Sequence, residues 1–361
     1  MSIRQMSARL HHLTWVGFVF LFLMILAGPS TAEESWNVDF INRVDNCTPQ
    51  DIVVDDNIAY VASDGFLAVL DVSDVSTPVL LTNYETPDRT VLIDKNDNLL
   101  YTTGYNFDSI QWVYESYLRI FDVSQPDQPV QLSEFYVPGY AQQLQVSGSF
   151  VFVVTTNHNQ GGFFIIDVSD PTEPVQAYFN ASDGIISFFA TDTTLYTCNA
   201  DSTFTTYDLP DHSNPQLLGS CEMEKLGYDV YVENGLAYAI GFSVWNDNRI
   251  QIFDVNDPQN PTFVVGHALA MNMTRKIFVR DTLAYINDTN DLGIFDVSDP
   301  LNIAQINVWD DTRYLRSFFI KNDKLYVVDE NAGIGIIDIT DPHQLWKLAF
   351  TTHPDLPGTF F

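Results

Sequence analysis

Four basic residues stand out as candidates for binding chemistry in a chain that is otherwise strongly acidic. The 361 residues contain 16 Lys and Arg against 47 Asp and Glu, a formal net charge of −31. Arg89, Arg275, Lys276 and Arg316 each stand where a predicted inner strand begins. A guanidinium can hold a carboxylate or a sulfate through two parallel hydrogen bonds. The four residues are therefore candidates for an anion site. The alternative is that the arginines pair with Asp51, Asp88 and Asp229 and only neutralise a channel.

Aromatic residues are expected beside these cations. Tyr228 falls at an equivalent strand start, and Tyr140 lies close to one. Trp112 and Trp245 lie in two long connections, residues 105–117 and 242–249. Long connections on a rigid scaffold commonly carry binding residues. Aromatic faces next to hydrogen-bonding groups suit sugars or peptides. The sequence thus predicts a ligand-binding surface, with the alternative that these aromatics merely cover sheet edges or pack on one another.

Catalytic and metal-binding motifs are weak. No two histidines beyond residue 32 have metal-ligand spacing, and no glycine-rich phosphate loop or nucleophile elbow appears. Carboxylates could supply a pair for glycosidic cleavage: Asp51, Asp88, Asp108, Glu115 and Asp229. We therefore assign no catalytic residue and keep a carbohydrate-active enzyme as the alternative function, with a purely structural surface component as a third.

Calcium is the one cofactor that the sequence suggests, and the suggestion is weak. Asp94, Asn96 and Asn98 alternate as at the start of a calcium loop, but Leu99 stands where that loop needs glycine. The segment is better interpreted as a hairpin turn, so no cofactor is expected.

A sevenfold internal repeat must position all of these residues. Its central aspartates are Asp71, Asp122, Asp167, Asp208, Asp254, Asp296 and Asp338, separated by 51, 45, 41, 46, 42 and 42 residues. A period of about 40–45 residues made of short strands is typical of one four-stranded propeller blade per repeat. In the first repeat we predict strands at residues 51–54, 58–62, 66–72 and 79–84. The fold class is therefore an all-β, seven-bladed propeller of four-stranded antiparallel blades.

Two features recur in each repeat. An apolar strand precedes the aspartate, and a turn rich in Ser, Asp and Pro follows it, which predicts that the aspartate caps the turn. The second strand carries an aligned aromatic that we expect between neighbouring blades: Tyr60, Tyr101, Phe152, Tyr196, Tyr238, Tyr285 and Tyr326.

The units, such as FIIDVSDPTEPV at residues 164–175 and GIFDVSDP at 293–300, resemble the LVIVD repeats of bacterial and archaeal surface proteins. The copy at Asp208 departs with YDLPDHSNP, and the last two copies lack the second proline. The resemblance implies a β-propeller, an extracellular location, and adhesion or ligand binding. It supplies no catalytic motif.

The N-terminus predicts export. Residues 1–32 combine Arg4 and Arg9 with an apolar run and a small-residue end, as in a secretory signal peptide. An uncleaved anchor is the alternative. The mature chain, residues 33–361, would then be one secreted or cell-surface propeller without a membrane span. Its acidity argues against nucleic acid, so we expect an extracellular glycan or a protein as partner. The oligomeric state does not follow from the sequence.

Two further predictions concern a disulfide and the closure of the ring. An exported chain permits a disulfide, and Cys198–Cys221 is the first choice because both ends lie in the same blade and on one face of the ring. Cys47 would then be free or form an intermolecular bond. Residues 38–44 and 346–352 both look like outer strands. We expect them to close the ring as a clasp in the seventh blade.

Overall fold

The computed structural model describes residues 48–108, 113–156, 161–181, 184–241, 247–310, 312, 314–330 and 333–351, all within the unit Phe40–Phe361. These ranges contain β-strands and turns, and no helix. No helix of membrane-crossing length and hydrophobicity therefore occurs in them. The predicted signal peptide, Cys47 and the strand predicted at 38–44 lie outside the described residues.

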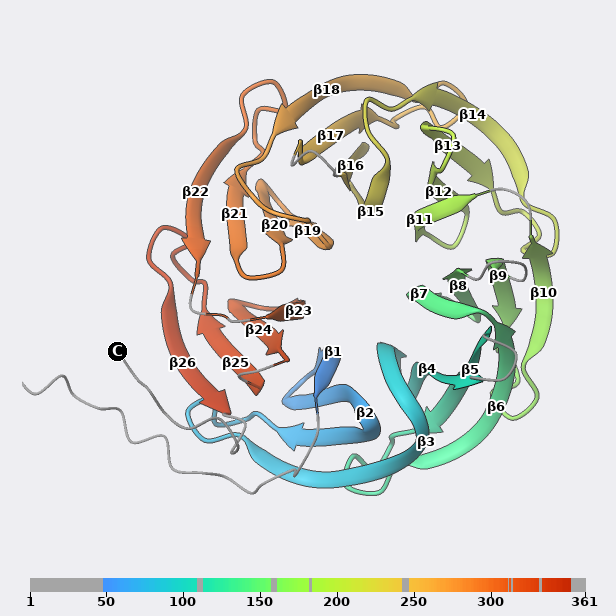
Figure 1. Ribbon diagram of the computed structural model, residues 1–361, viewed down its shortest axis with the longest axis vertical. Coiled ribbons are helices and arrows are strands. Elements are labelled where there is room, and N and C mark those ends of the chain that lie inside the picture. The colour runs from blue at the N-terminus through green and yellow to red at the C-terminus, as the bar shows by residue number, and fades with distance from the viewer. Residues whose placement is uncertain are drawn as a thin grey trace, which may run out of the picture. The chain divides into compact units, whose positions relative to one another are not determined.

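In the described part of the chain, twenty-six strands form antiparallel sheets. The sheets follow one another around a ring (Figure 1). The first sheet contains β1 (Pro49–Asp55), β2 (Ile58–Asp71), β3 (Val79–Asn96), β4 (Leu99–Asp108), β5 (Val113–Asp122) and β6 (Val130–Pro138). The second contains β7 (Tyr140–Ser147), β8 (Phe150–Thr156), β9 (Gly162–Asp167) and β10 (Val175–Asn180). The third contains β11 (Ile185–Ala190), β12 (Thr194–Asn199), β13 (Thr203–Asp208) and β14 (Gln216–Glu222).

The remaining three sheets also have four strands each. The fourth contains β15 (Gly227–Glu233), β16 (Leu236–Gly241), β17 (Arg249–Asp254) and β18 (Thr262–Ala268). The fifth contains β19 (Lys276–Arg280), β20 (Leu283–Asn287), β21 (Leu292–Asp296) and β22 (Ala304–Trp309). The sixth contains β23 (Leu315–Lys321), β24 (Lys324–Asp329), β25 (Gly333–Asp338) and β26 (Trp346–Thr351).

Counted as hydrogen-bonded sheets, the described propeller has six blades and not the seven that we predicted. The first two repeats share one sheet because β3 runs without a break from the first repeat into the second. β2 pairs with β1 through residues 58–63 and with β3 through residues 64–71. β3 pairs in turn with β2 through residues 79–89 and with β4 through residues 89–96.

β2 nevertheless folds back on itself, as the separate second and third strands of other repeats do. Its bend is the Asp64-Gly65 turn, where Gly65 has φ +76°, a conformation that glycine adopts without steric cost. Val72 N donates to Asn57 O at 2.7 Å, which matches the bond from Val123 N to Asn98 O across β4 and β5. The merged sheet therefore keeps the local geometry of the repeat.

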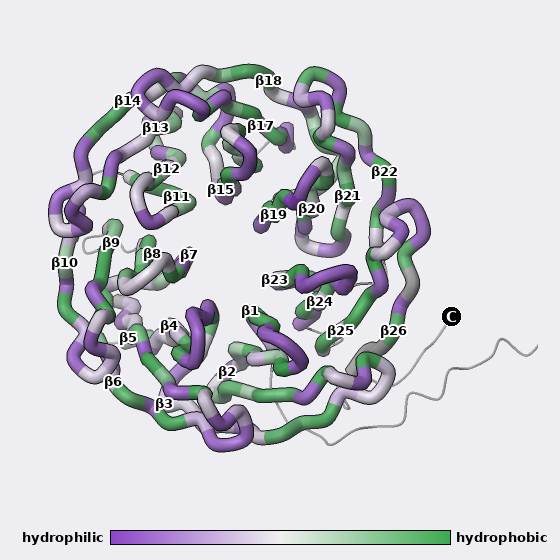
Figure 2. The backbone as a smooth tube through the Cα atoms, turned by 180° about the vertical axis from the view of Figure 1, so that it is seen from behind, coloured by the Kyte–Doolittle hydropathy of each residue, from purple (hydrophilic) through white to green (hydrophobic). Residues whose placement is uncertain are grey.

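The repeated aspartates cap turns, as predicted. Asp71 Oδ1 accepts a hydrogen bond from Ser73 N at 2.8 Å, and the same bond recurs at Asp122, Asp167, Asp254, Asp296 and Asp338. At Asp208 the residue two positions on is Pro210, which has no N–H to donate. Figure 2 shows that these connections are hydrophilic and the strands between them largely hydrophobic.

The predicted aromatic series is confirmed as core. All seven second-strand aromatics are buried, from Phe152 at 0% exposure to Tyr196 at 8%. They pack between neighbouring sheets: Tyr196, for example, shares a core cluster with Val230 and Phe253 of the next blade. Adjacent blades are thus held together mainly by buried apolar surface.

The ring closes where β1 lies beside β23 (Figure 1). β26 is the outer strand of the last sheet, so all four of its strands come from the C-terminal repeat. The C-terminal strand prediction is confirmed, whereas the N-terminal half of the expected clasp falls outside the described residues.

The predicted Cys198–Cys221 disulfide is wrong, because both thiols are free. Cys198 on β12 pairs with Phe204 on β13, and Phe204 pairs with Cys221 on β14. The two cysteines are therefore two strands apart, roughly 10 Å at the usual spacing, and a disulfide needs Cα atoms within about 7 Å. Burial raises the pKa of the Cys198 thiol to about 12.

Candidate functional site

A closed circle of hydrogen bonds joins the inner strands around the axis of the ring. The inner edge of a sheet leaves backbone groups without a strand partner, and side chains of the neighbouring inner strand bond them here. Ile93 N donates to Asp51, Val146 N to Asp94, Phe188 N to Gln143 and Ile277 N to Asp229. Ser187 donates to Gly227 O, Lys276 to Ser317, and Ser317 to Asp51. This axial circle explains why polar residues stand at these strand positions.

Above the circle, on the face where each inner strand begins, lie seven residues that we call the mouth cluster: Arg89, Tyr105, Tyr114, Tyr140, Arg275, Tyr314 and Arg316. On one side, the Tyr140 ring contacts Tyr105 and Tyr114, with centroids 4.8 and 5.5 Å away. The Arg89 guanidinium lies 5.9 Å from the centroid of Tyr105. Its Nε donates to Asp64 Oδ1 at 2.6 Å, and its side chain is 57% exposed.

On the other side of the mouth cluster, two arginines share one tyrosine. The guanidinium carbons of Arg316 and Arg275 lie 4.6 and 5.1 Å from the Tyr314 centroid. Arg316 pairs with Glu330. Arg275 Nη2 donates to the Tyr314 hydroxyl at 3.0 Å, and within the described part of the chain it has no ion-pair partner.

Tyr140 connects the two sides. Burial raises the pKa of its phenol, and the charges of Arg316 and Arg89 both oppose that rise. The two arginines therefore act electrostatically on the same hydroxyl. The cluster combines rigid aromatic faces with guanidinium groups, an arrangement that can stack on a ring and bond an anion together.

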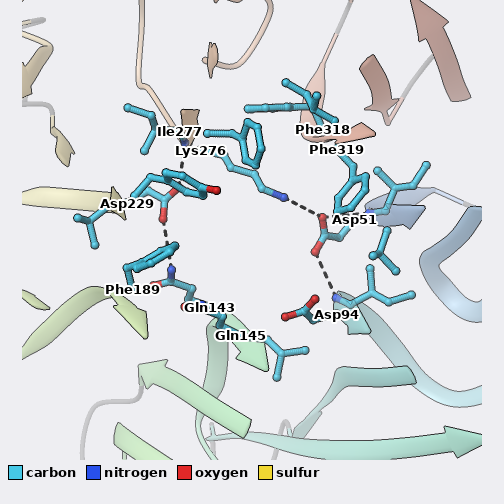
Figure 3. Close-up of a pocket in the computed structure, with 18 residues that line it drawn as sticks. Asp51, Asp94, Gln143, Gln145, Phe189, Asp229, Lys276, Ile277, Phe318 and Phe319 are labelled. Carbon is cyan, nitrogen blue, oxygen red and sulfur yellow. Dashed lines mark hydrogen bonds and ion pairs between the residues drawn. The ribbon is translucent and has the colours of Figure 1, made fainter. Parts of the chain in front are cut away.

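Below the mouth cluster an axial cavity of about 220 Å³ is lined by all seven inner strands, β1, β3, β7, β11, β15, β19 and β23 (Figure 3). Three carboxylates, Asp51, Asp94 and Asp229, border it with one ammonium, that of Lys276. Lys276 Nζ lies 3.5 Å from Asp51 Oδ1. The cavity therefore carries more negative than positive charge.

Two of these carboxylates have unusual pKa values because of burial. Burial raises the pKa of Asp229 to about 7 and that of Asp94 to about 6, although backbone N–H groups donate to both. Desolvation disfavours a charged carboxylate when no cation is close enough to offset it. Lys276 lowers both pKa values, but less than burial raises them.

The structure brings together four of the predicted site residues, Arg89, Tyr140, Arg275 and Arg316, in the mouth cluster. Lys276 belongs to the cavity, one layer deeper. Tyr228 is exposed at the start of β15, next to Asp229 in the chain. Trp112 and Trp245 lie outside the described residues, so the structure does not place their rings.

The alternative prediction that these arginines pair with Asp51, Asp88 and Asp229 is wrong. Asp51 pairs with Lys276, and Asp88 pairs with the fully buried Arg119 through both carboxylate oxygens, at 2.8 and 2.7 Å. Asp64, Arg119 and Glu330 were missed by sequence reasoning. Asp64 could have been found, because its Asp-Gly turn and the start of the next inner strand share one face.

Comparison with known families agrees with the architecture. The sequence model of the LVIVD repeat matches residues 48–86, 138–178, 272–307 and 313–347. This chain is an LVIVD-repeat β-propeller protein. The four matches cover the repeats of Asp71, Asp167, Asp296 and Asp338. No curated protein matches the sequence significantly.

Solved structures resemble this LVIVD-repeat protein in fold alone. A functionally unknown protein from Desulfotomaculum acetoxidans DSM 771 has 12% identity and a TM-score of 0.59 over 72% of this chain and 84% of its own. Hsv2p of Kluyveromyces lactis has 13% identity and a TM-score of 0.58 over 85% and 99%. The N-terminal domain of Nup159 has 12% identity and a TM-score of 0.53 over 80% and 89%.

Proposed function

We propose that this LVIVD-repeat propeller is a secreted or cell-surface binding module that holds an acidic glycan at the mouth cluster. The observation that carries the proposal is Arg275, whose guanidinium bonds a phenol and has no carboxylate partner among the described residues. An arginine held this way keeps donors for a carboxylate or a sulfate.

The neighbouring aromatics suit a sugar ring. Tyr114 and Phe107 are exposed on the hairpin of β4 and β5, and their ring centroids lie 5.0 Å apart. The apolar face of a sugar stacks on such aromatic rings, while the sugar hydroxyls form hydrogen bonds with polar neighbours. Arg89 and Arg316 already pair with Asp64 and Glu330. They would therefore orient the aromatics and add long-range attraction, and Arg275 would make the direct contact.

Electrostatics makes the mouth cluster selective. Removing Arg4 and Arg9 with the signal peptide leaves 14 basic and 47 acidic residues, a net charge of −33. The remaining surface therefore repels polyanions, so an acidic glycan is attracted only where positive charge is concentrated. Export, which the N-terminal segment predicts, would place this surface in contact with such glycans.

The test is binding of the purified protein to an array of neutral, carboxylated and sulfated glycans. We expect saturable binding to acidic glycans that falls at least tenfold in Arg275→Gln, about 1.4 kcal/mol. The matched control is Arg280→Gln, which removes the same charge from β19, four residues beyond Lys276, where Arg280 bonds Asn322 O. Equal loss in both variants would indicate only a net-charge effect, and a blank array would overturn the glycan proposal.

A further inference from the structure

The axial cavity has features of a binding site that the proposed glycan function does not use. Its lining comes from two tiers of inward-facing residues. The tier nearer the mouth includes Asp51, Gln143, Asp229 and Lys276, and the deeper tier includes Asp94, Gln145, Phe189, Tyr231, Phe278 and Phe319. Figure 3 shows that the labelled side chains of Asp51, Asp94, Gln143, Phe189, Asp229 and Lys276 converge on one space.

The cavity is short of positive charge. Lys276, its one ammonium, is engaged by Asp51 and by Ser317 Oγ, 3.5 and 3.0 Å away. Asp94 accepts hydrogen bonds from the backbone N–H groups of Lys95 and Val146. Asp229 accepts from Ile277 N at 2.9 Å and from Gln143 Nε2 at 3.3 Å. Neither Asp94 nor Asp229 has an ion-pair partner among the described residues.

A continuous aromatic wall faces part of this space. The Tyr231 centroid lies 4.9 Å from that of Phe189 on β11 and 4.9 Å from that of Phe278 on β19. Phe319 on β23 also lines the cavity. Aromatic faces attract cations, most strongly where water is excluded, and they serve ammonium groups that carry alkyl substituents.

The volume of the cavity and the spacing of its charged groups favour a small organic occupant. The cavity volume of about 220 Å³ lies below the roughly 300–1,000 Å³ of pockets for drug-sized ligands, so it suits a small molecule better than an oligosaccharide. No three carboxylate, histidine or cysteine side chains in the described ranges converge closely enough to hold a metal ion. The carboxylates are instead spread around the cavity, which favours an organic cation over a single metal ion.

We propose that the axial cavity binds a small organic ammonium ion, held between the aromatic wall and the carboxylates of Asp94 and Asp229. The alkyl groups would contact Phe189, Tyr231 and Phe278, and the positive charge would offset the two carboxylates. The site is separate from the mouth cluster, so this inference stands or falls independently of glycan binding.

The experiment compares choline with 3,3-dimethylbutan-1-ol, its uncharged isostere, by titration calorimetry on the intact protein. We expect saturable choline binding at millimolar concentration or tighter, and at least tenfold weaker binding of the isostere. Asp229→Asn and Asp94→Asn keep an oxygen that can accept the backbone hydrogen bonds. Each should weaken choline binding at least fivefold. Phe278→Leu tests the wall in the same way.

Asp257→Asn is the matched control, since it makes the same change in an exposed turn where Asp257 caps Gln259 N. It should leave choline binding unchanged. Equal binding of the isostere would overturn the proposal, because the cavity would then be only an apolar pocket. Absence of saturable binding of both choline and tetramethylammonium by the wild-type protein would overturn it as well. A melting curve for each variant separates loss of the site from loss of the fold.

Discussion

Ser317 on β23 donates a 2.6 Å hydrogen bond to Asp51 on β1 across 266 residues of chain, and this bond closes the axial circle. Asp51 also accepts from Ile93 N on β3, so one carboxylate ties the first inner strand to both of its neighbours. Residues at the two ends of the repeat array are thus bonded directly, next to the apolar packing between β1 and β23.

We predict that Ser317→Ala lowers the free energy of unfolding by about 1.5–3 kcal/mol, the range for a hydrogen bond to a charged group. Both partners are buried, with Ser317 5% and Asp51 8% exposed. Ser76→Ala removes an exposed bond of the same length, 2.6 Å, to Asp74 and should cost less than about 1 kcal/mol. Urea denaturation measures both. Similar losses of unfolding free energy in the two variants would show that the buried Ser317–Asp51 bond stabilises the fold no more than an exposed bond does.

The buried pair of Arg119 and Asp88 predicts a larger effect. Asp88 lies in the crossing part of β3, and a Cβ added to Gly104 would lie only 2.1 Å from its Oδ1, so the carboxylate packs directly against Gly104. Arg119→Met leaves that buried charge unpaired and should cost about 3–5 kcal/mol. Arg249→Met, at a partly exposed arginine paired with Glu224 and Asp247, should cost about 1 kcal/mol or less. Thermal and urea unfolding would contradict this if the two variants lost the same stability.

Interactions between residues close in the chain could be predicted from the sequence, whereas those between distant residues could not. The turn caps and buried aromatics were predicted correctly because they depend on residues close in the chain and recur with the repeat. The Asp71–Ser73 bond spans two residues, and the pattern shows it directly. The merging of the first two repeats was not predictable in this way, because it depends on β3 pairing with β2 on one side and with β4 on the other.

The sequence predicted which face these arginines share, but it did not predict which carboxylates they contact. Strand starts placed Arg89, Arg275 and Arg316 on one face, but a shared face does not say which carboxylate lies closest. The bond of Arg89 to Asp64 spans 25 residues and depends on the bend in β2 and β3. The disulfide prediction failed for a related reason: Cys198 and Cys221 share a face, but β13 separates their strands.

The last prediction concerns stability as a function of pH. Burial raises the pKa of Asp229 from 3.8 to about 7, so between these values the folded chain binds a proton that the unfolded chain has lost. Stability therefore falls as pH rises from about 4 to about 7. Asp94, with a pKa of about 6, adds to the same trend. Lys276 opposes it by favouring the charged carboxylates, and the turn aspartates, whose pKa values are lowered as at Asp254, lose their contribution only at lower pH.

We expect a higher melting temperature at pH 5.5 than at pH 8, and a smaller difference in Asp229→Asn. That variant should also be more stable than the wild type at pH 8, because it avoids a buried charge while keeping an acceptor for Ile277 N. Asp254→Asn is the control, since its carboxylate is exposed and its pKa is shifted in the opposite direction. Calorimetric melting at several pH values, without added amines, measures all three proteins. An Asp229→Asn profile as steep as that of the wild type would mean that Asp229 is already ionised in the folded protein at pH 5.5.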